Sequence, residues 1–178
     1  MVWRPFARAL RHGPYTRPAE RVDEAAARDV AARLDAAAQR RLGRSLAVLH
    51  VGAGGCNGCE LELRMLDSLV YDLARFGLRF VASPRQADVL LVTGPVTRAM
   101  HGALRHAWEA TPDPKFVVAV GDCAIDGGVF KGSYAITGGI DSALPVDLTI
   151  RGCPPTPNQV LDGLRALIAA NTAPPATP

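Results

Sequence analysis

The stretch that decides the fold is residues 51–62, VGAGGCNGCELE. It continues an apolar run over residues 46–51, which is typical of a buried β-strand. Two of the four cysteines in the chain, Cys56 and Cys59, stand in the glycine-rich turn that follows this run. Helix-forming residues come directly after the turn. The stretch therefore predicts a strand, a tight turn that carries two thiols, and a helix.

The same order of elements recurs along the chain. Strands are predicted at residues 46–51, 78–82, 88–93, 115–120 and 146–150, and helices at 60–76, 97–110 and 157–169. Leu61, Met65, Leu69 and Leu73 give the helix over 60–76 its apolar stripe, and Gly77 is its expected end. Residues 121–139 are predicted to be a glycine-rich loop. Alternating strands and helices predict an α/β fold, a flavodoxin-like open, mostly parallel sheet flanked by helices.

The chain divides into three parts. Residues 1–44 are a basic N-terminal arm and a helical extension, 45–170 form the α/β domain, and 171–178 are a tail expected to be disordered. Within residues 1–21 there are five arginines and one glutamate. Such an arm is typical of contact with an anionic surface, and equally of a solvated tail.

The composition predicts a soluble globular protein, with 48% hydrophobic and 21% charged residues. No apolar run approaches the roughly 20 residues that span a bilayer. The N-terminus lacks the apolar segment of a secretory signal, so we expect the chain to be cytosolic. In that compartment cysteines are more often ligands or redox groups than disulfides.

All four cysteines come just after predicted strands. Cys56 and Cys59 follow the first strand, Cys123 follows the fourth and Cys153 follows the fifth. Because the carboxyl ends of parallel strands share one edge of the sheet, ligands bind at that edge. The topology therefore predicts that four thiols distant in sequence meet in one place.

Four thiols at one edge could hold zinc or an iron–sulfur cluster. Structural zinc is usually bound by two close pairs of cysteines, whereas here one pair is followed by a gap of 63 residues and then by two single cysteines with 29 residues between them. This spacing favours a [4Fe–4S] cluster over zinc and over unliganded thiols. Neither nucleotide-binding glycine motif fits, because Asn57 takes the third glycine position and no Gly-Lys-Ser/Thr follows.

Four motifs in order, CNGCELE, TGPVTRAM, GDCAIDGG and PVDLTIRGCPPTP, resemble the small subunit of [NiFe] hydrogenases and the equivalent cluster-bearing subunit of NADH:quinone oxidoreductase (complex I). The resemblance covers about residues 45–168. It implies one [4Fe–4S] cluster on Cys56, Cys59, Cys123 and Cys153. The CNGC form, in place of the adjacent cysteines of complex I, makes the membrane-bound, formate hydrogenlyase-type hydrogenases the nearer likeness.

The resemblance also implies partners and a role. The chain would relay electrons between a ferredoxin-like iron–sulfur subunit and a large catalytic subunit, beside membrane arm subunits and without nucleic acid. It would lie on the cytoplasmic face of the inner membrane and perform no catalysis of its own. A complex I-like quinone oxidoreductase subunit and a zinc-stabilised α/β binding module remain the alternatives.

Four further residues are candidates for a role at the site. Two of them, Glu60 and Arg98, have two interpretations each, and the other two have a structural one. The resemblance gives Glu60 a proton-carrying role, and a first-turn carboxylate favoured by the helix dipole explains it as well. Arg98 would neutralise cluster charge or form an interface salt bridge. His50 is predicted to be a core or hydrogen-bonding residue, and Asp122 a turn residue.

Overall fold

The computed structural model of the protein describes residues 45–172. The basic arm and helical extension predicted over residues 1–44, and residues 173–178 of the predicted tail, lie outside the described residues. Within the described part, no helix has the length and the apolar character needed to cross a membrane.

A five-stranded, all-parallel sheet forms the centre of the described domain. Its strands, in spatial order, are β2 (Leu78–Phe80), β1 (Leu46–Gly52), β3 (Val89–Thr93), β5 (Phe116–Val120) and β7 (Leu148–Ile150). In order along the chain this is 2-1-3-4-5, the flavodoxin-like arrangement. The predicted fold class is therefore confirmed.

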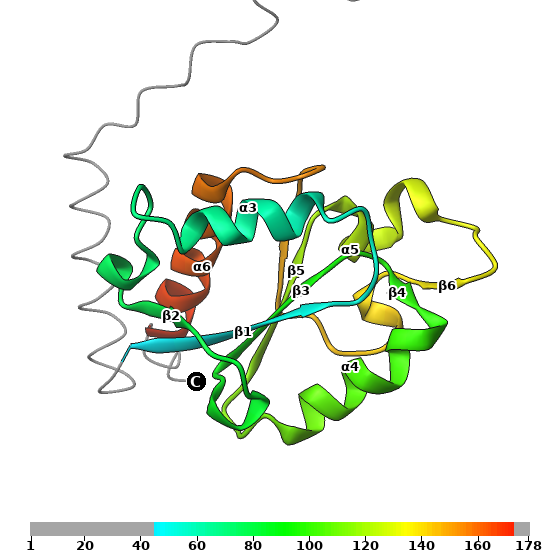
Figure 1. The fold of residues 1–178 in the computed structure, drawn as a ribbon. Coiled ribbons are helices and arrows are strands. Elements are labelled where there is room, and N and C mark those ends of the chain that lie inside the picture. Colours follow the sequence, from blue (N-terminus) through cyan, green and yellow to red (C-terminus); the bar gives the residue numbers. More distant parts are fainter. Residues whose placement is uncertain (1–44, 173–178) are drawn as a thin grey trace, which may run out of the picture.

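Helices cover both faces of the sheet (Figure 1). The helices α3 (Gly58–Leu66) and α6 (Pro157–Thr172) pack on one face, and α4 (Arg98–Ala110) and the short α5 (Asp122–Asp126) pack on the other. A hydrophobic core lies on each face of the sheet, and alternate residues of β3 pack into one or the other. Val89 and Leu91 face α3 and α6, whereas Leu90 and Val92 face the opposite side. Burial of both faces explains why the strands are continuous apolar runs.

The predicted helix over 60–76 is wrong in its second half. The helix α3 ends at Leu66, and a short 3₁₀ helix, Leu73–Phe76, follows a turn. Leu63 and Leu66 are the α3 residues buried against the core. In the predicted stripe, Leu61, Met65 and Leu69 are exposed, Leu69 at 99%, whereas Leu73 is buried in the 3₁₀ helix.

The glycine-rich segment over 121–139 holds more structure than the predicted loop. It contains α5 and the strand β6 (Ile136–Gly138), which pairs antiparallel with β4 (Val96–Thr97) in a small separate sheet. The Thr137 hydroxyl donates to the Val96 carbonyl at 2.9 Å and secures this pairing. Elements this short leave too little periodicity in a sequence to be detected.

Two aspartates fasten strands together at the amino edge of the sheet. Asp147, just before β7, donates its N–H to the Val117 carbonyl at 2.9 Å, and its carboxylate accepts the Val117 N–H at 2.7 Å. Asp88, just before β3, makes the same reciprocal pair with Ala47, at 2.8 and 2.9 Å. Each pair lets a side chain take the place of a missing backbone partner.

Candidate functional site

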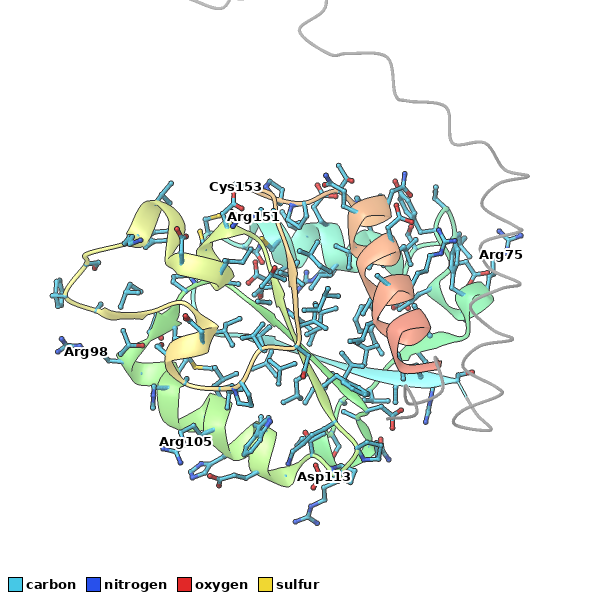
Figure 2. All side chains as sticks on the ribbon, turned by 180° about the vertical axis from the view of Figure 1, so that it is seen from behind. Arg75, Arg98, Arg105, Asp113, Arg151 and Cys153 are labelled. Carbon is cyan, nitrogen blue, oxygen red and sulfur yellow. The ribbon has the colours of Figure 1, made fainter. Side chains whose placement is uncertain are left out.

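All four cysteines lie at the carboxyl edge of the sheet. Cys56 is in the turn after β1, Cys59 is in the first turn of α3, Cys123 is in α5 just after β5, and Cys153 follows β7. Figure 2 shows Cys153 at this edge, with Arg151 beside it. Cys123 is buried and Cys59 half-buried, whereas Cys56 and Cys153 are exposed. The site thus has an inner side and an open side.

The thiols lie within electrostatic reach of one another. Burial raises the pKa of Cys59 to about 11, and Glu60 and the other three cysteines add to the rise. Burial also raises the pKa of Cys123, with Cys153 and Cys56 among the further causes. Four thiolates would therefore repel one another here, and cations that bind them would remove that cost.

Two glycines form a cradle against the inner sulfurs. A Cβ added at Gly121, where φ is +90°, would lie 2.6 Å from Cys59 Sγ. A Cβ added at Gly128, where φ is +49°, would lie 2.8 Å from Cys123 Sγ. Backbone can approach the sulfurs this closely only where no side chain is present. Such close backbone around thiolates is suited to an iron–sulfur group, whose sulfurs accept backbone hydrogen bonds.

The four thiols are grouped without converging on one point. Within residues 45–172, no three cysteine, histidine or acidic side chains are placed to share a single metal ion. In a cubane cluster each thiolate binds a different iron atom. Four cysteines are also the donor set that an iron–sulfur cluster of this kind takes.

Glu60 is the end of a partly buried polar chain. The Thr93 hydroxyl donates to Glu60 Oε1 at 2.7 Å, and His50 Nε2 lies 3.0 Å from the same hydroxyl oxygen. Because the Thr93 hydrogen is given to Glu60, His50 Nε2–H is the donor to Thr93. Glu60 also stands in the first turn of α3, as one of its two interpretations requires. Its proton-carrying role stays a prediction, which unchanged proton exchange in a Glu60→Gln variant would remove.

Sequence reasoning missed Thr93, although the single hydroxyl that ends the apolar strand β3 was a signal for it. It also passed over Arg151, which lies near Cys153. Arg98, in contrast, points into solvent away from Cys153 in Figure 2. This orientation favours the interface role of Arg98 over neutralisation of charge at the cysteines.

His50 makes the stability of the fold depend on pH. Burial lowers the pKa of His50 from its ordinary value of 6.5, with Glu60 opposing the shift and Arg64 adding to it. Because the folded chain binds this proton less readily than the unfolded chain, protonation favours unfolding. The contribution of His50 to the free energy of unfolding is therefore complete above pH 6.5 and lost as the pH falls toward its folded-state pKa.

We expect a His50→Gln variant to lose less stability between about pH 7.5 and about pH 5.5 than the wild type. Glutamine can still donate an N–H to Thr93, but it does not titrate in this range. Urea unfolding at the two pH values measures the difference. His106→Gln, at an exposed position on α4, is the matched control for the substitution itself. Equal slopes in wild type and His50→Gln would contradict the assignment.

The fold and the site define a class: open parallel α/β domains with four cysteines at one sheet edge. The chain belongs to the family described as NADH ubiquinone oxidoreductase, 20 kDa subunit, whose model matches residues 56–167. This family membership places the chain among subunits of oxidoreductase complexes and confirms the resemblance found in its motifs.

Named relatives come from two kinds of complex. The chain is 46% identical over 132 residues to formate hydrogenlyase subunit 7 of Escherichia coli, covering 74% of this chain and 52% of that one. It is 46% identical over 123 residues to the probable membrane-bound hydrogenase subunit mbhJ of Pyrococcus furiosus, covering 69% and 74%. It is 47% identical over 110 residues to a subunit of the NADH-quinone oxidoreductase of Bacteroides thetaiotaomicron, covering 61% and 56%. The chain thus spans about half the length of the first relative.

Solved structures share the architecture. A chain of the archaeal membrane-bound sulfane sulfur reductase superposes with a TM-score of 0.64 at 37% identity, covering 76% of this chain and 72% of that one. A chain of an NAD+-reducing [NiFe]-hydrogenase superposes with a TM-score of 0.54 at 22% identity, covering 76% and 96%, which supports the fold alone.

Proposed function

We propose that this chain carries one [4Fe–4S] cluster on Cys56, Cys59, Cys123 and Cys153 and relays electrons within a membrane-bound hydrogenase complex. The observation that carries the proposal is the gathering of four thiols at one sheet edge. When bound, such a cluster accepts and donates single electrons. The chain itself supplies the ligands, the close backbone at Gly121 and Gly128, and the shape of the site.

The two sides of the site have different tasks. Cys59 and Cys123 lie inside and bring the site close to the apolar body of the domain. Cys56 and Cys153 lie on the open side, where partner subunits would have to approach to exchange electrons and exclude water. The α3 residues Leu61 and Met65 are exposed apolar side chains that such a partner would cover.

The relatives are parts of multisubunit complexes, which supports a proposal about partner subunits. We assign a large catalytic subunit of the hydrogenase type and a ferredoxin-like iron–sulfur subunit as the two neighbours in the relay. Membrane arm subunits would attach the complex to the cytoplasmic face of the inner membrane. Relatives whose names describe membrane-bound complexes support this placement.

A complex I-like quinone oxidoreductase is the second candidate, because a subunit of such an enzyme is about as similar over the matched region. The hydrogenase assignment is favoured by the longer match to the formate hydrogenlyase subunit. The CNGC pattern of Cys56 and Cys59 favours it further.

Rapid-freeze EPR on the anaerobically purified complex distinguishes the two candidates. With hydrogen gas as the sole reductant, the hydrogenase assignment predicts a reduced-cluster signal within the mixing time. Decylubiquinone added to the reduced complex should leave that signal unchanged. A cluster that hydrogen does not reduce and that the quinone reoxidises would favour the quinone oxidoreductase assignment over the hydrogenase assignment. A cluster that exchanges electrons with neither would contradict both assignments.

A further inference from the structure

Two hydrogen bonds join the residues that directly precede Cys123 and Cys153. The Asp122 N–H donates to the Gly152 carbonyl at 2.9 Å. In return, the Gly152 N–H donates to Asp122 Oδ1 at 3.1 Å. The two loops that carry these cysteines, 30 residues apart in the chain, are therefore fastened one residue before each sulfur-bearing residue.

This fastening begins where the sheet ends. The last register pair of β5 and β7 is Val120 with Ile150, and the Gly121 N–H then donates to the Ile150 carbonyl at 2.8 Å. At Asp122 the chain turns into α5, so its backbone no longer follows β7 as a strand would. The Asp122 carboxylate supplies the acceptor that the next residue of a strand would have supplied, and the pairing reaches Gly152.

The same reciprocal pair occurs at the other edge of the sheet. The Asp147 N–H donates to the Val117 carbonyl, and the Asp147 carboxylate accepts a hydrogen bond from the Val117 N–H. The four cysteines all lie at the opposite edge, away from that end of β5 and β7. The hydrogen-bond pair at Asp147 therefore joins two strands only, whereas the pair at Asp122 joins two loops that carry cysteines.

We infer that Asp122 is a positioning residue that sets the spacing of Cys123 and Cys153 through its hydrogen bond to Gly152. This inference rests on the proposed function, because spacing matters when both thiolates bind one cluster. The carboxylate acts here as an acceptor, so an amide oxygen at the same position serves equally well. Asp122 thereby gains a role at the site beyond the turn chemistry predicted from the sequence.

The test uses three variants of the full chain: Asp122→Ala, Asp122→Asn and Asp147→Ala. Hydrogen exchange at the Gly152 amide is measured on the chain freed of iron. Iron content, the g-values of the reduced cluster and the rate of iron loss to a chelator are measured on the loaded protein, with the subunits that co-purify with it.

Asp122→Ala should raise the Gly152 exchange rate about tenfold, as expected for the loss of one hydrogen bond. It should also shift the g-values and speed the loss of iron. Asp122→Asn should restore all three properties, since asparagine keeps the Oδ1 acceptor. Asp147→Ala should lower thermal stability and leave the Gly152 exchange and the g-values as in the wild type.

The inference is overturned if Asp122→Ala keeps wild-type exchange at Gly152 and wild-type g-values. It is equally overturned if Asp122→Asn behaves like Asp122→Ala, or if Asp147→Ala shifts the g-values as much. A wild-type protein without iron would instead contradict the proposed function. The exchange measurement on the iron-free chain would still report on the hydrogen bond in that case.

Discussion

Replacing Cys123 with serine is expected to lower the iron content of the protein at least tenfold. Cys123 is the most buried of the four thiols, with 8% of its surface exposed, so solvent is poorly placed to supply a substitute ligand. A serine hydroxyl remains protonated at neutral pH and is a far poorer iron ligand than a thiolate. Iron analysis and EPR of the reduced protein measure the effect.

Ala124→Ser is the matched control for this change. Ala124 is fully buried, adjacent to Cys123 and on the same helix α5. The control introduces the same hydroxyl into the same element but removes no thiol. It should therefore retain its iron, although it destabilises the fold. If Cys123→Ser kept a full complement of iron, Cys123 would not be a ligand and the four-cysteine site would be wrong.

Gly121→Ala is expected to have the second large effect, a loss of most of the bound iron. The new methyl group would lie 2.6 Å from Cys59 Sγ, closer than atoms in contact can approach. Alanine would also have to adopt a φ of +90° and a ψ of 154°, a region essentially restricted to glycine that costs about 1–3 kcal/mol. Either the Cys59 sulfur or the turn after β5 must move, and the proposed cluster depends on both because Cys123 follows that turn.

Gly132→Ala separates these two causes. Gly132 also has a positive φ, +83°, so alanine there is strained as well, yet nothing lies within 4 Å of the added Cβ. The control should lose about 1–2 kcal/mol of the free energy of unfolding and keep its iron. Equal iron loss in the two variants would show that strain in the fold, and not contact with Cys59, is responsible.

The sheet and the cysteine edge were predictable from the sequence because their signals are local. Apolar runs mark β1, β3 and β5, and glycine turns follow them. Parallel topology then places Cys56, Cys59, Cys123 and Cys153 at one edge without any knowledge of contacts.

The features that the sequence prediction got wrong or missed have a common cause. Each depends on which distant residues a side chain contacts in the folded chain. Leu61 and Met65 on α3 are apolar yet exposed, so the sequence could not tell which face of this helix meets the sheet. Thr93 and Asp122 take their roles from partners 33 and 30 residues away. Such pairings appear only when the chain is folded.

The central claim is that the four cysteines hold an electron-carrying cluster. The measurement that tests it most directly is the content of iron, zinc and acid-labile sulfide, with EPR of the anaerobically reduced protein purified with the subunits that bind it. The account predicts about four irons and four sulfides per chain and a reduced-cluster signal that Cys123→Ser abolishes. One zinc per chain, with no sulfide and no signal, would contradict it and leave a zinc-stabilised binding module.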